Sequence, residues 1–350
     1  MQKSIGVKVL HRFNPERAHT FSLHALKIAA ANPVASKVME KKYIVDDERL
    51  EQRVLGTIFS NPVGLAAGYD KNAVVINGAR LLGFGFTEVG GITPKPQYGN
   101  TKPRLFRFNE QESLQNAMGF NNDGLDVIKS RVEMLHPFQI PIGINVAKNK
   151  DTPLDKALDD YIAVIKGFGD NCDYFVINVS SPNTKGLRDL QNEQFLEQVI
   201  GNGKRYTTRP ILVKISPDLE FERAITLCKA AVEKGASGII ATNTTTDYTL
   251  LDGARETGGI SGKALRVKSF LLFKHIAKEL FGKTTLISVG GIDSPEEALK
   301  RIRHGASLVQ FYSGLVFKGP SLASYINKEL LTTLRKERLD NIKEIVGSAL

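Results

Sequence analysis

The sequence predicts an α/β fold, a (β/α)8 TIM barrel with an N-terminal two-helix extension. Short apolar runs alternate with amphipathic helical stretches such as 221–234 and 267–280. The runs are apolar on both faces, as expected for parallel strands that are joined by crossover helices and buried beneath them. The length of 350 residues also suits this barrel, which commonly takes roughly 250 residues or more. A strand or hairpin at 50–60 should close the barrel bottom. The eight expected strands are 63–67, 86–92, 142–146, 174–179, 211–215, 238–242, 286–289 and 308–312.

Residues 1–45 lie outside this alternation and are expected to form a helical, membrane-associating domain, followed by the barrel domain at 46–350. Residues 14–16, Asn-Pro-Glu, place a capping Asn, a Pro at the first helical position and an acid near the positive end of the helix dipole. Residues 32–33, Asn-Pro, end this helix and begin a second one, which runs into the basic pair 41–42. Apolar faces flanked by cations suit an anionic membrane interface, although packing on the barrel explains them equally well. Apolar positions on one side of the first helix are Phe21, Ala25 and Ile28.

Composition excludes several classes of protein. The 42% hydrophobic and 24% charged content describes a soluble globular chain, and no apolar run approaches the ~18 residues that span a bilayer. The N-terminus lacks the layout of a secretory signal. Cys172 and Cys228 are expected to be reduced and buried, which fits a cytosolic compartment, and the six histidines show no metal-ligand spacing. The spacing of the histidines therefore predicts no metal site. The net charge of +10 is spread along the chain, and aromatic residues do not alternate with the basic ones, so no nucleic acid is expected.

Polar and glycine-rich segments follow the expected strands, at the barrel end where active sites lie. A single segment of this kind is usually an ordinary turn, but several such segments on one rim of the barrel indicate a ligand-binding site. Gly290-Gly291 after strand seven and Ser313-Gly314 after strand eight, with further donors on the loop 258–262, suit a phosphate. Lys214, in the middle of strand five, should point into the mouth and stabilise anionic charge on a bound ring. The segments are 66–72, 90–94, Asn145 with Lys148, Asn178 with Ser181, 242–245, 290–291 and 312–314, and amides at Asn116, Asn183 and Asn243 would read a planar heterocycle.

Longer motifs carry a family resemblance that runs from end to end. They include PERAH at 15–19, GLAAGYDKN at 64–72, TPKPQYGNTKPRLFR at 93–107, NAMGFNN at 116–122, INVSSPNTKGLR at 177–188 and VQFYSGLVFKGP at 309–320. With these motifs the chain resembles the class 2, quinone-dependent dihydroorotate dehydrogenases. The resemblance implies oxidation of (S)-dihydroorotate to orotate with FMN as cofactor, in de novo pyrimidine (UMP) biosynthesis. It also implies ubiquinone or menaquinone as the electron acceptor and a monomer bound peripherally to the cytoplasmic side of the cell inner membrane.

The resemblance also assigns roles to residues. Ser181 would be the catalytic base, where the soluble class 1 enzymes, which lack the N-terminal extension, use cysteine. Gly91 departs from the family pattern, which usually has Thr or Ser beside the flavin. Substrate contacts would come from Lys71, which would pair with the carboxylate, and from Asn116, Ala117, Met118, Gly119, Phe120, Asn178, Asn183, Asn243 and Thr244. FMN contacts would come from Ala67, Gly68, Tyr69, Asp70, Lys71, Gly91, Asn145, Asn178, Lys214, Thr242, Gly262, Gly291, Tyr312 and Ser313. The quinone route would pass His19, Arg107 and Tyr312.

Two other hypotheses remain open at this point. A dihydrouridine synthase is also a flavin-binding barrel, and a basic chain would suit tRNA. That family uses a cysteine acid, however, and neither Cys172 nor Cys228 follows an expected strand. A non-catalytic binding barrel is the other alternative. The intact Lys71, Ser181 and Lys214 favour an enzyme, and replacing Ser181 by Ala should abolish turnover only in the enzyme.

Overall fold

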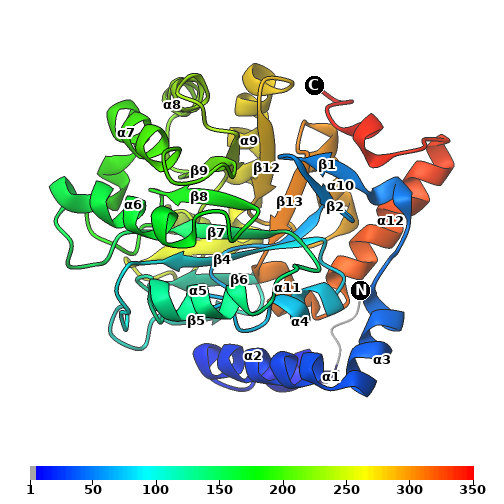
Figure 1. Ribbon diagram of the computed structural model, residues 1–350. Coiled ribbons are helices and arrows are strands. Elements are labelled where there is room, and N and C mark those ends of the chain that lie inside the picture. Colours follow the sequence, from blue (N-terminus) through cyan, green and yellow to red (C-terminus); the bar gives the residue numbers. More distant parts are fainter. Residues whose placement is uncertain (1–4) are drawn as a thin grey trace.

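The computed structural model of this chain describes residues 5–350 and contains the predicted parallel barrel (Figure 1). All eight strands lie where the sequence predicted them, and each pairs with its neighbours in chain order before the last strand closes on the first. The barrel strands are β3 (Val63–Leu65), β4 (Phe86–Ile92), β7 (Ile142–Val146), β8 (Tyr174–Asn178), β9 (Ile211–Ile215), β10 (Gly238–Ala241), β12 (Thr285–Val289) and β13 (Leu308–Phe311). Their carboxyl ends therefore meet on one rim.

Helices cover the outside of the barrel. Helix α10 shows why they begin where they do, since Ser294 caps it by accepting the N–H of Glu297 at 3.3 Å and Pro295 occupies the first position. The outer helices are α4 (Ile76–Leu81), α5 (Leu125–Glu133), α6 (Ala157–Phe168), α7 (Glu193–Gly203), α8 (Phe221–Glu233), α9 (Arg266–Leu280), α10 (Pro295–Arg303), α11 (Ser313–Lys318) and α12 (Leu322–Glu337). Short 3₁₀ turns are Glu48–Leu50, Leu154–Lys156, Leu187–Leu190, Tyr248–Leu250, Lys263–Leu265 and Ile342–Ile345.

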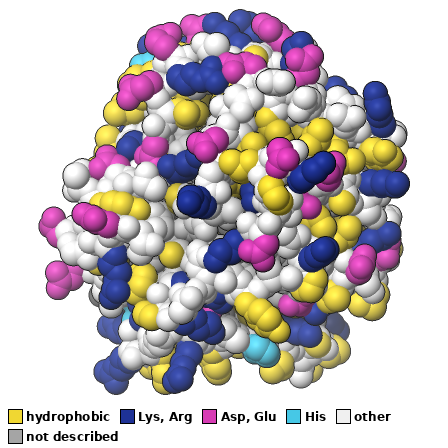
Figure 2. All heavy atoms as spheres, turned by 90° about the vertical axis from the view of Figure 1, so that its left-hand side faces the viewer, with side chains coloured by type: hydrophobic (Ala, Val, Ile, Leu, Met, Phe, Trp, Pro, Cys, Tyr) yellow, Lys and Arg dark blue, Asp and Glu magenta, His cyan; other side chains and the backbone are white. Residues whose placement is uncertain are grey.

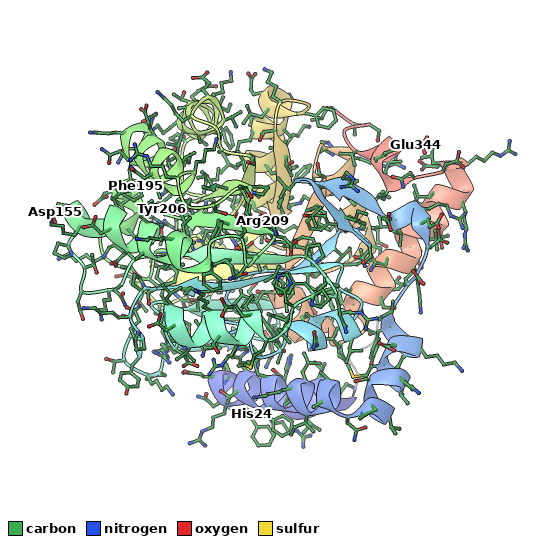
Figure 3. All side chains as sticks on the ribbon, in the orientation of Figure 1. His24, Asp155, Phe195, Tyr206, Arg209 and Glu344 are labelled. Atoms are coloured by element: carbon green, nitrogen blue, oxygen red, sulfur yellow. The ribbon has the colours of Figure 1, made fainter. Side chains whose placement is uncertain are left out.

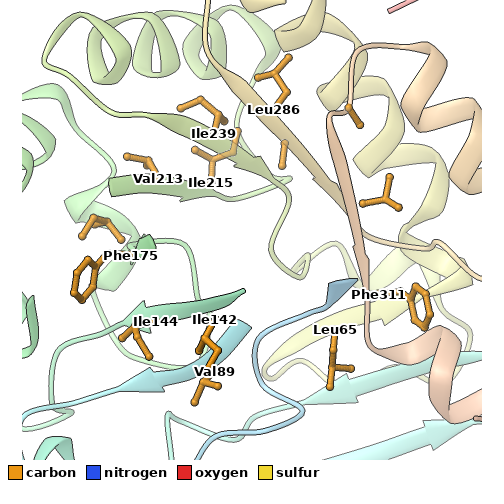
Figure 4. Close-up of a cluster of buried hydrophobic side chains, with 14 of the residues drawn as sticks. Leu65, Val89, Ile142, Ile144, Phe175, Val213, Ile215, Ile239, Leu286 and Phe311 are labelled. Atoms are coloured by element: carbon orange, nitrogen blue, oxygen red, sulfur yellow. The ribbon is translucent and has the colours of Figure 1, made fainter. Parts of the chain in front are cut away.

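The core has two parts, because alternate strand residues face opposite sides of the barrel wall. One set, including Val213 and Phe175, packs beneath the helices (Figure 4). The other set fills the barrel interior, where large rings lie against glycines of neighbouring strands. A Cβ on Gly64 would overlap the ring of Phe86. The predicted bottom hairpin is confirmed as β1 (Gln52–Val54) and β2 (Thr57–Phe59), and the ring of Phe59 packs edge-on against Phe86 with 5.2 Å between centroids.

The extension forms α1 (Ile5–Leu10), α2 (Pro15–Ala31) and α3 (Pro33–Tyr43) along one side of the barrel (Figure 1). Both predicted helix starts are confirmed, since Asn14 and Asn32 cap them with their side-chain oxygens. Helix α1 was not predicted, and residues 1–4 of the predicted extension lie outside the described part of the chain. Within residues 5–350, no helix combines the length and the apolar character needed to cross a bilayer.

Helix α2 packs on the barrel with a face other than the one that carries Phe21, Ala25 and Ile28, and the sequence had left open whether that side would face the barrel or a membrane. Ala18 and Leu26 are buried, whereas Phe21 and Ile28 are 62% and 69% exposed. His24 on the same helix points away from the barrel (Figure 3). The exposed apolar side chains of α2 are therefore free of contacts with the barrel core.

A small antiparallel sheet adds to the carboxyl-end rim. It consists of β5 (Leu105–Phe108), β6 (Ser113–Asn116) and β11 (Gly259–Gly262), in the order β11-β6-β5. The prediction of a loop at 258–262 is therefore wrong for most of its length, because these residues pair with β6 in the register Gly259 to Asn116. Short strands that pair with residues far away in the chain leave no periodic pattern to detect.

Charged side chains do not gather into a single basic patch on the face shown in Figure 2. Lys and Arg are interspersed there with Asp and Glu. Both cysteines are free and buried, as predicted. Among the described residues, no three His, Cys, Asp or Glu side chains lie close enough together to hold a metal ion.

Candidate active site

An open cavity of about 1210 Å³ lies at the carboxyl ends of the strands, and residues at the ends of every barrel strand except β7 line it. The small β5–β6–β11 sheet forms another part of the wall. The structure thus brings together most of the site predicted from the sequence. The predicted residues that line the cavity are Ala67, Gly68, Lys71, Gly91, Asn116, Met118, Gly119, Phe120, Asn178, Ser181, Asn183, Lys214, Thr242, Asn243, Thr244, Gly262, Gly291, Tyr312 and Ser313.

Four of the residues predicted to contact substrate or FMN do not line this cavity: Ala117, Tyr69, Asp70 and Asn145. The Asp70 carboxylate accepts the backbone N–H groups of Asn72, Val74 and Val75 at 2.7–3.2 Å and so fixes the turn before α4. Burial raises the pKa of Asp70, and these bonds partly offset the rise. Tyr69 faces a second cavity.

Lys148 also differs from the expectation. Its ammonium donates to the carbonyl oxygens of Asn149 at 3.0 Å and Thr152 at 2.7 Å. It therefore holds the loop after β7 together and does not reach the cavity.

A line of side-chain hydrogen bonds runs from the cavity into the barrel interior. Asn243 donates to Asn178 at 3.1 Å, and Asn178 donates to Asn145 at 2.8 Å. Asn145 in turn donates to Glu88 Oε1 at 2.6 Å. Asn145 thus acts behind Asn178, where it fixes the direction in which the Asn178 amide points.

Glu88 is the functional residue that the sequence analysis missed. Its side chain is fully buried on β4, and Oε1 lies 3.3 Å from Nζ of Lys214, whose side chain is 5% exposed. Oε2 accepts a hydrogen bond from Gln310 at 2.9 Å. Because a buried charge is tolerated only when it is paired, Glu88 and Lys214 must be considered together. A charged residue inside an apolar run is the signal that singled out Lys214, and the run 86–92 carries the same signal.

Ser181 lies at the floor of the cavity and is 6% exposed. Its Oγ accepts the backbone N–H of Asn183 at 3.3 Å. Three polar atoms in the neighbouring segments are buried without a protein partner, namely Asn183 Oδ1, Thr184 Oγ1 and Thr244 Oγ1. Buried polar atoms are normally paired, so this part of the cavity is suited to a polar ligand or ordered water.

Arg188 fixes the segment that carries Ser181. Its guanidinium donates to the carbonyl oxygens of Ser180 at 3.1 Å and Thr244 at 2.9 Å, and it pairs with Asp218 at 2.8 Å. Burial alone would raise the pKa of Asp218, but hydrogen bonds from Lys268, Thr245, Thr246 and Arg188 outweigh it and lower this pKa to about 2. The carboxylate therefore stays charged and keeps the loop in place.

Lys71 supplies the positive charge at the cavity wall nearest to the N-terminal extension. Burial and the charge of Arg104 lower the pKa of Lys71 to about 8, although Asp70 and Glu16 oppose the shift. Its ammonium donates to the carbonyl oxygen of Gly68. Near neutral pH the lysine is thus mostly protonated and can bind a carboxylate.

The end of the cavity near β12 and β13 is built from glycine backbone and hydroxyl groups. Gly291 has φ +75°, and a Cβ there would lie 2.8 Å from the backbone N of Arg266. Only glycine fits this approach. Ser261 and Ser313 share a hydrogen bond at 2.8 Å between their hydroxyl oxygens. Backbone and hydroxyl groups of this kind can bind a phosphate, and the phosphate site expected here stays a prediction.

A second, mostly apolar cavity of about 1220 Å³ lies between the extension and the barrel. It contains all three residues of the predicted quinone route, His19, Arg107 and Tyr312. Burial and the charge of Lys71 lower the pKa of His19 to about 3, so its imidazole is neutral at physiological pH. Leu105, Leu114 and Tyr312 line both cavities and form the wall between them.

Comparisons with known proteins agree with this architecture. A family model described as dihydroorotate dehydrogenase matches residues 49–334. Relatives named dihydroorotate dehydrogenase (quinone) are 52% identical over 340 residues in a Nitratiruptor species and 53% identical over 341 residues in a Sulfurovum species. These alignments cover 97% of this chain in both cases, and 97% and 96% of the relatives. The crystal structure of DHODH from Eimeria tenella in complex with ferulenol superposes with a TM-score of 0.86 at 36% identity and covers 98% of both chains. On the family match and on relatives that align almost from end to end, the chain belongs to the dihydroorotate dehydrogenase family.

Proposed function

We propose that this chain oxidises (S)-dihydroorotate to orotate in de novo pyrimidine biosynthesis, with FMN in the first cavity and a membrane quinone as the electron acceptor. The observation that carries the proposal is the wall of Leu105, Leu114 and Tyr312, which separates a cavity lined by several amide and charged side chains from a mostly apolar one. Such a wall lets electrons pass between two substrates that differ greatly in polarity. The word quinone in the names of the relatives supports the same division.

The residues of the first cavity fit FMN. Its glycine-rich end near Gly291 and Ser313 offers backbone N–H groups to a phosphate. Lys214 holds a buried positive charge where the cavity meets the barrel interior. FMN held here would supply a hydride acceptor, and Lys214 would stabilise the negative charge of the reduced ring.

The substrate fits against Lys71 and the amide side chains. The Lys71 ammonium binds the carboxylate, and Asn178 and Asn243 hold the edges of the ring. Ser181 Oγ takes the proton from C5 of dihydroorotate. Serine is a weak base at its ordinary pKa, so it needs ordered water, for which the unpaired Thr184 Oγ1 provides a partner.

The second cavity fits the head and the first part of the tail of ubiquinone or menaquinone. The neutral His19 and the Arg107 guanidinium can bind quinone oxygens, and Tyr312 separates them from the first cavity. Outside it, exposed apolar side chains on the extension would contact lipid, helped by the basic pair 41–42 on α3. The exposed side chains are Phe13, Ile28, Val34 and Val38, together with Phe21, which also lines the second cavity. We further propose that the protein is a peripheral monomer on the cytoplasmic side of the inner membrane, with residues 1–45 as its membrane-associating domain.

The test is an anaerobic titration of the purified yellow protein with dihydroorotate, followed by the visible flavin absorbance. Bleaching that a soluble ubiquinone analogue reverses, and that fumarate or NAD does not, is the expected result. A yellow protein that stays yellow would refute the substrate. A colourless protein that cannot be reconstituted with FMN would refute the cofactor.

A further inference from the structure

An ion pair joins the N-terminal extension to the strand that leads to the substrate-side loops. Glu16, in the first turn of α2, accepts two hydrogen bonds on Oε1 from Arg104, at 2.8 Å from Nη2 and 3.2 Å from Nε. The side chains are 16% and 7% exposed. Burial raises the pKa of Glu16, but the hydrogen bond and the charge of Arg104 outweigh this effect and leave the pKa below its usual value. The pair is therefore charged at neutral pH and partly shielded from solvent.

Arg104 also forms hydrogen bonds with the loop 97–104. Its remaining guanidinium nitrogen, Nη1, donates to the carbonyl oxygen of Asn100 at 3.0 Å and to that of Tyr98. The Arg104 carbonyl oxygen accepts the backbone N–H of Ala117 at 2.8 Å. One side chain thus binds the extension and the loop 97–104 at once, while its backbone binds the cavity-wall segment 116–120.

Asn100 then reaches the cavity wall. Its Nδ2 donates to the carbonyl oxygens of Ala117 and Asn183, both at 3.1 Å. The Asn183 amide donates to Asn116 Oδ1 at 2.8 Å, and the Asn183 backbone N–H binds Ser181. A continuous path of hydrogen bonds therefore connects Glu16 on α2 with the segments that line the first cavity.

We infer that Glu16 is a positioning residue for the substrate cavity: through Arg104 it holds Asn100 where that residue ties the segments of Ala117 and Asn183 together. The inference rests on the proposed function in naming orotate as the ligand. The extension then contributes to substrate binding as well as to the apolar cavity. A purely structural ion pair would attach α2 to the barrel without affecting the loop or the ligand.

Hydrogen–deuterium exchange of the FMN-loaded protein tests the positioning without any substrate. In Glu16→Gln the side chain keeps its size but loses its charge, so the loop should open more often. We expect roughly tenfold faster exchange in peptides that cover 97–104 and 116–122, and unchanged exchange elsewhere in the barrel. Lys102→Gln is the matched control, because Lys102 pairs with the same carboxylate at 3.4 Å but is 69% exposed. Equal exchange in Glu16→Gln and wild type would overturn the inference.

Orotate binding, measured by equilibrium dialysis, tests the consequence for the ligand. Glu16→Gln should raise the dissociation constant for orotate roughly tenfold, the factor expected for loss of a charge-assisted hydrogen bond, whereas Lys102→Gln should stay within about twofold of wild type. Asn100→Asp, which removes the bridging donor, should weaken orotate binding at least as much. The double variant should then bind no more weakly than Asn100→Asp alone, because the two residues act in series.

The outcomes separate this inference from the proposed function. Wild-type protein that binds orotate, with Glu16→Gln binding it equally well, would overturn the positioning role only. Additive losses in the double variant would also overturn it. Wild-type protein that binds no orotate would refute the proposed function, while faster exchange in Glu16→Gln would still support the positioning of the loop.

Discussion

Replacing Glu88 by Gln removes a buried negative charge with almost no change in side-chain volume. Lys214 Nζ, 3.3 Å away, is then left without a charged partner, and Asn145 and Gln310 compete for the one remaining carbonyl acceptor. Removing one partner of a buried ion pair typically costs about 3–5 kcal/mol. Against a total stability of about 5–15 kcal/mol, we expect a large fall in the free energy of unfolding.

The same change should also make the bound flavin easier to reduce. Reduction adds negative charge to the ring, and the variant lacks one nearby negative charge while its buried Lys214 is no longer neutralised. This loss of one negative charge favours the reduced, more negative ring. We expect the two-electron midpoint potential to rise by about 30–60 mV, which corresponds to roughly 1.4–2.8 kcal/mol.

The assays are urea denaturation followed by circular dichroism and a spectroelectrochemical titration of the flavin. Glu297→Gln is the control, because Glu297 forms a buried ion pair at 2.7 Å with Arg301, which, unlike Lys214, lines neither cavity. This control should lose stability without a change in flavin potential. An unchanged potential in Glu88→Gln, together with reduced stability, would refute a role for Glu88 beyond neutralising a buried lysine.

Three further predictions concern the two cavities. Affinity for orotate should be constant below about pH 8 and fall about tenfold per pH unit above it, because Lys71, with a pKa of about 8, loses its charge as the pH rises. A pH series of dialysis measurements checks this. The Lys71→Gln variant should show no such pH dependence. His19→Ala should raise the KM for a quinone analogue roughly tenfold and leave the anaerobic bleaching rate with dihydroorotate unchanged, since His19 lines only the second cavity; a slower bleaching rate would contradict this. Gly91→Ala would place a Cβ 2.7 Å from the ring of Phe120, so urea denaturation should show a loss of about 1–3 kcal/mol, and no loss would mean that the ring moves freely.

The barrel was predictable because its signal is local and repeated. Each strand is a short apolar run, and the residues after it are polar because they face the cavity. The sheet of β5, β6 and β11 gave no such signal, since β6 pairs with residues far away in the chain, such as Gly259 with Asn116. The predicted apolar side of α2 was detected correctly as a pattern, but the pattern does not tell whether Phe21 faces the barrel or the solvent.

The site was predictable to a similar extent. Residues with a distinctive chemistry, such as Lys71 and Ser181, were identified and do line the cavity. Residues that support the site were harder to predict, because their importance depends on partners in other strands. The importance of Glu88 depends on its ion pair with Lys214 on β9. Asp70 fixes a turn, which its position in a motif could not reveal.

The wall formed by Leu105, Leu114 and Tyr312 has a kinetic consequence for inhibitors. Under the proposed function, a molecule that fills the apolar cavity would leave the first cavity open, so it would compete with the electron acceptor and dihydroorotate would not displace it. Orotate analogues should instead compete with dihydroorotate and should not be displaced by the electron acceptor. Two inhibitors of different chemical character, one in each cavity, can therefore bind the same protein molecule at the same time. If Tyr312 transmits structural changes between the cavities, binding of one inhibitor will alter the affinity for the other.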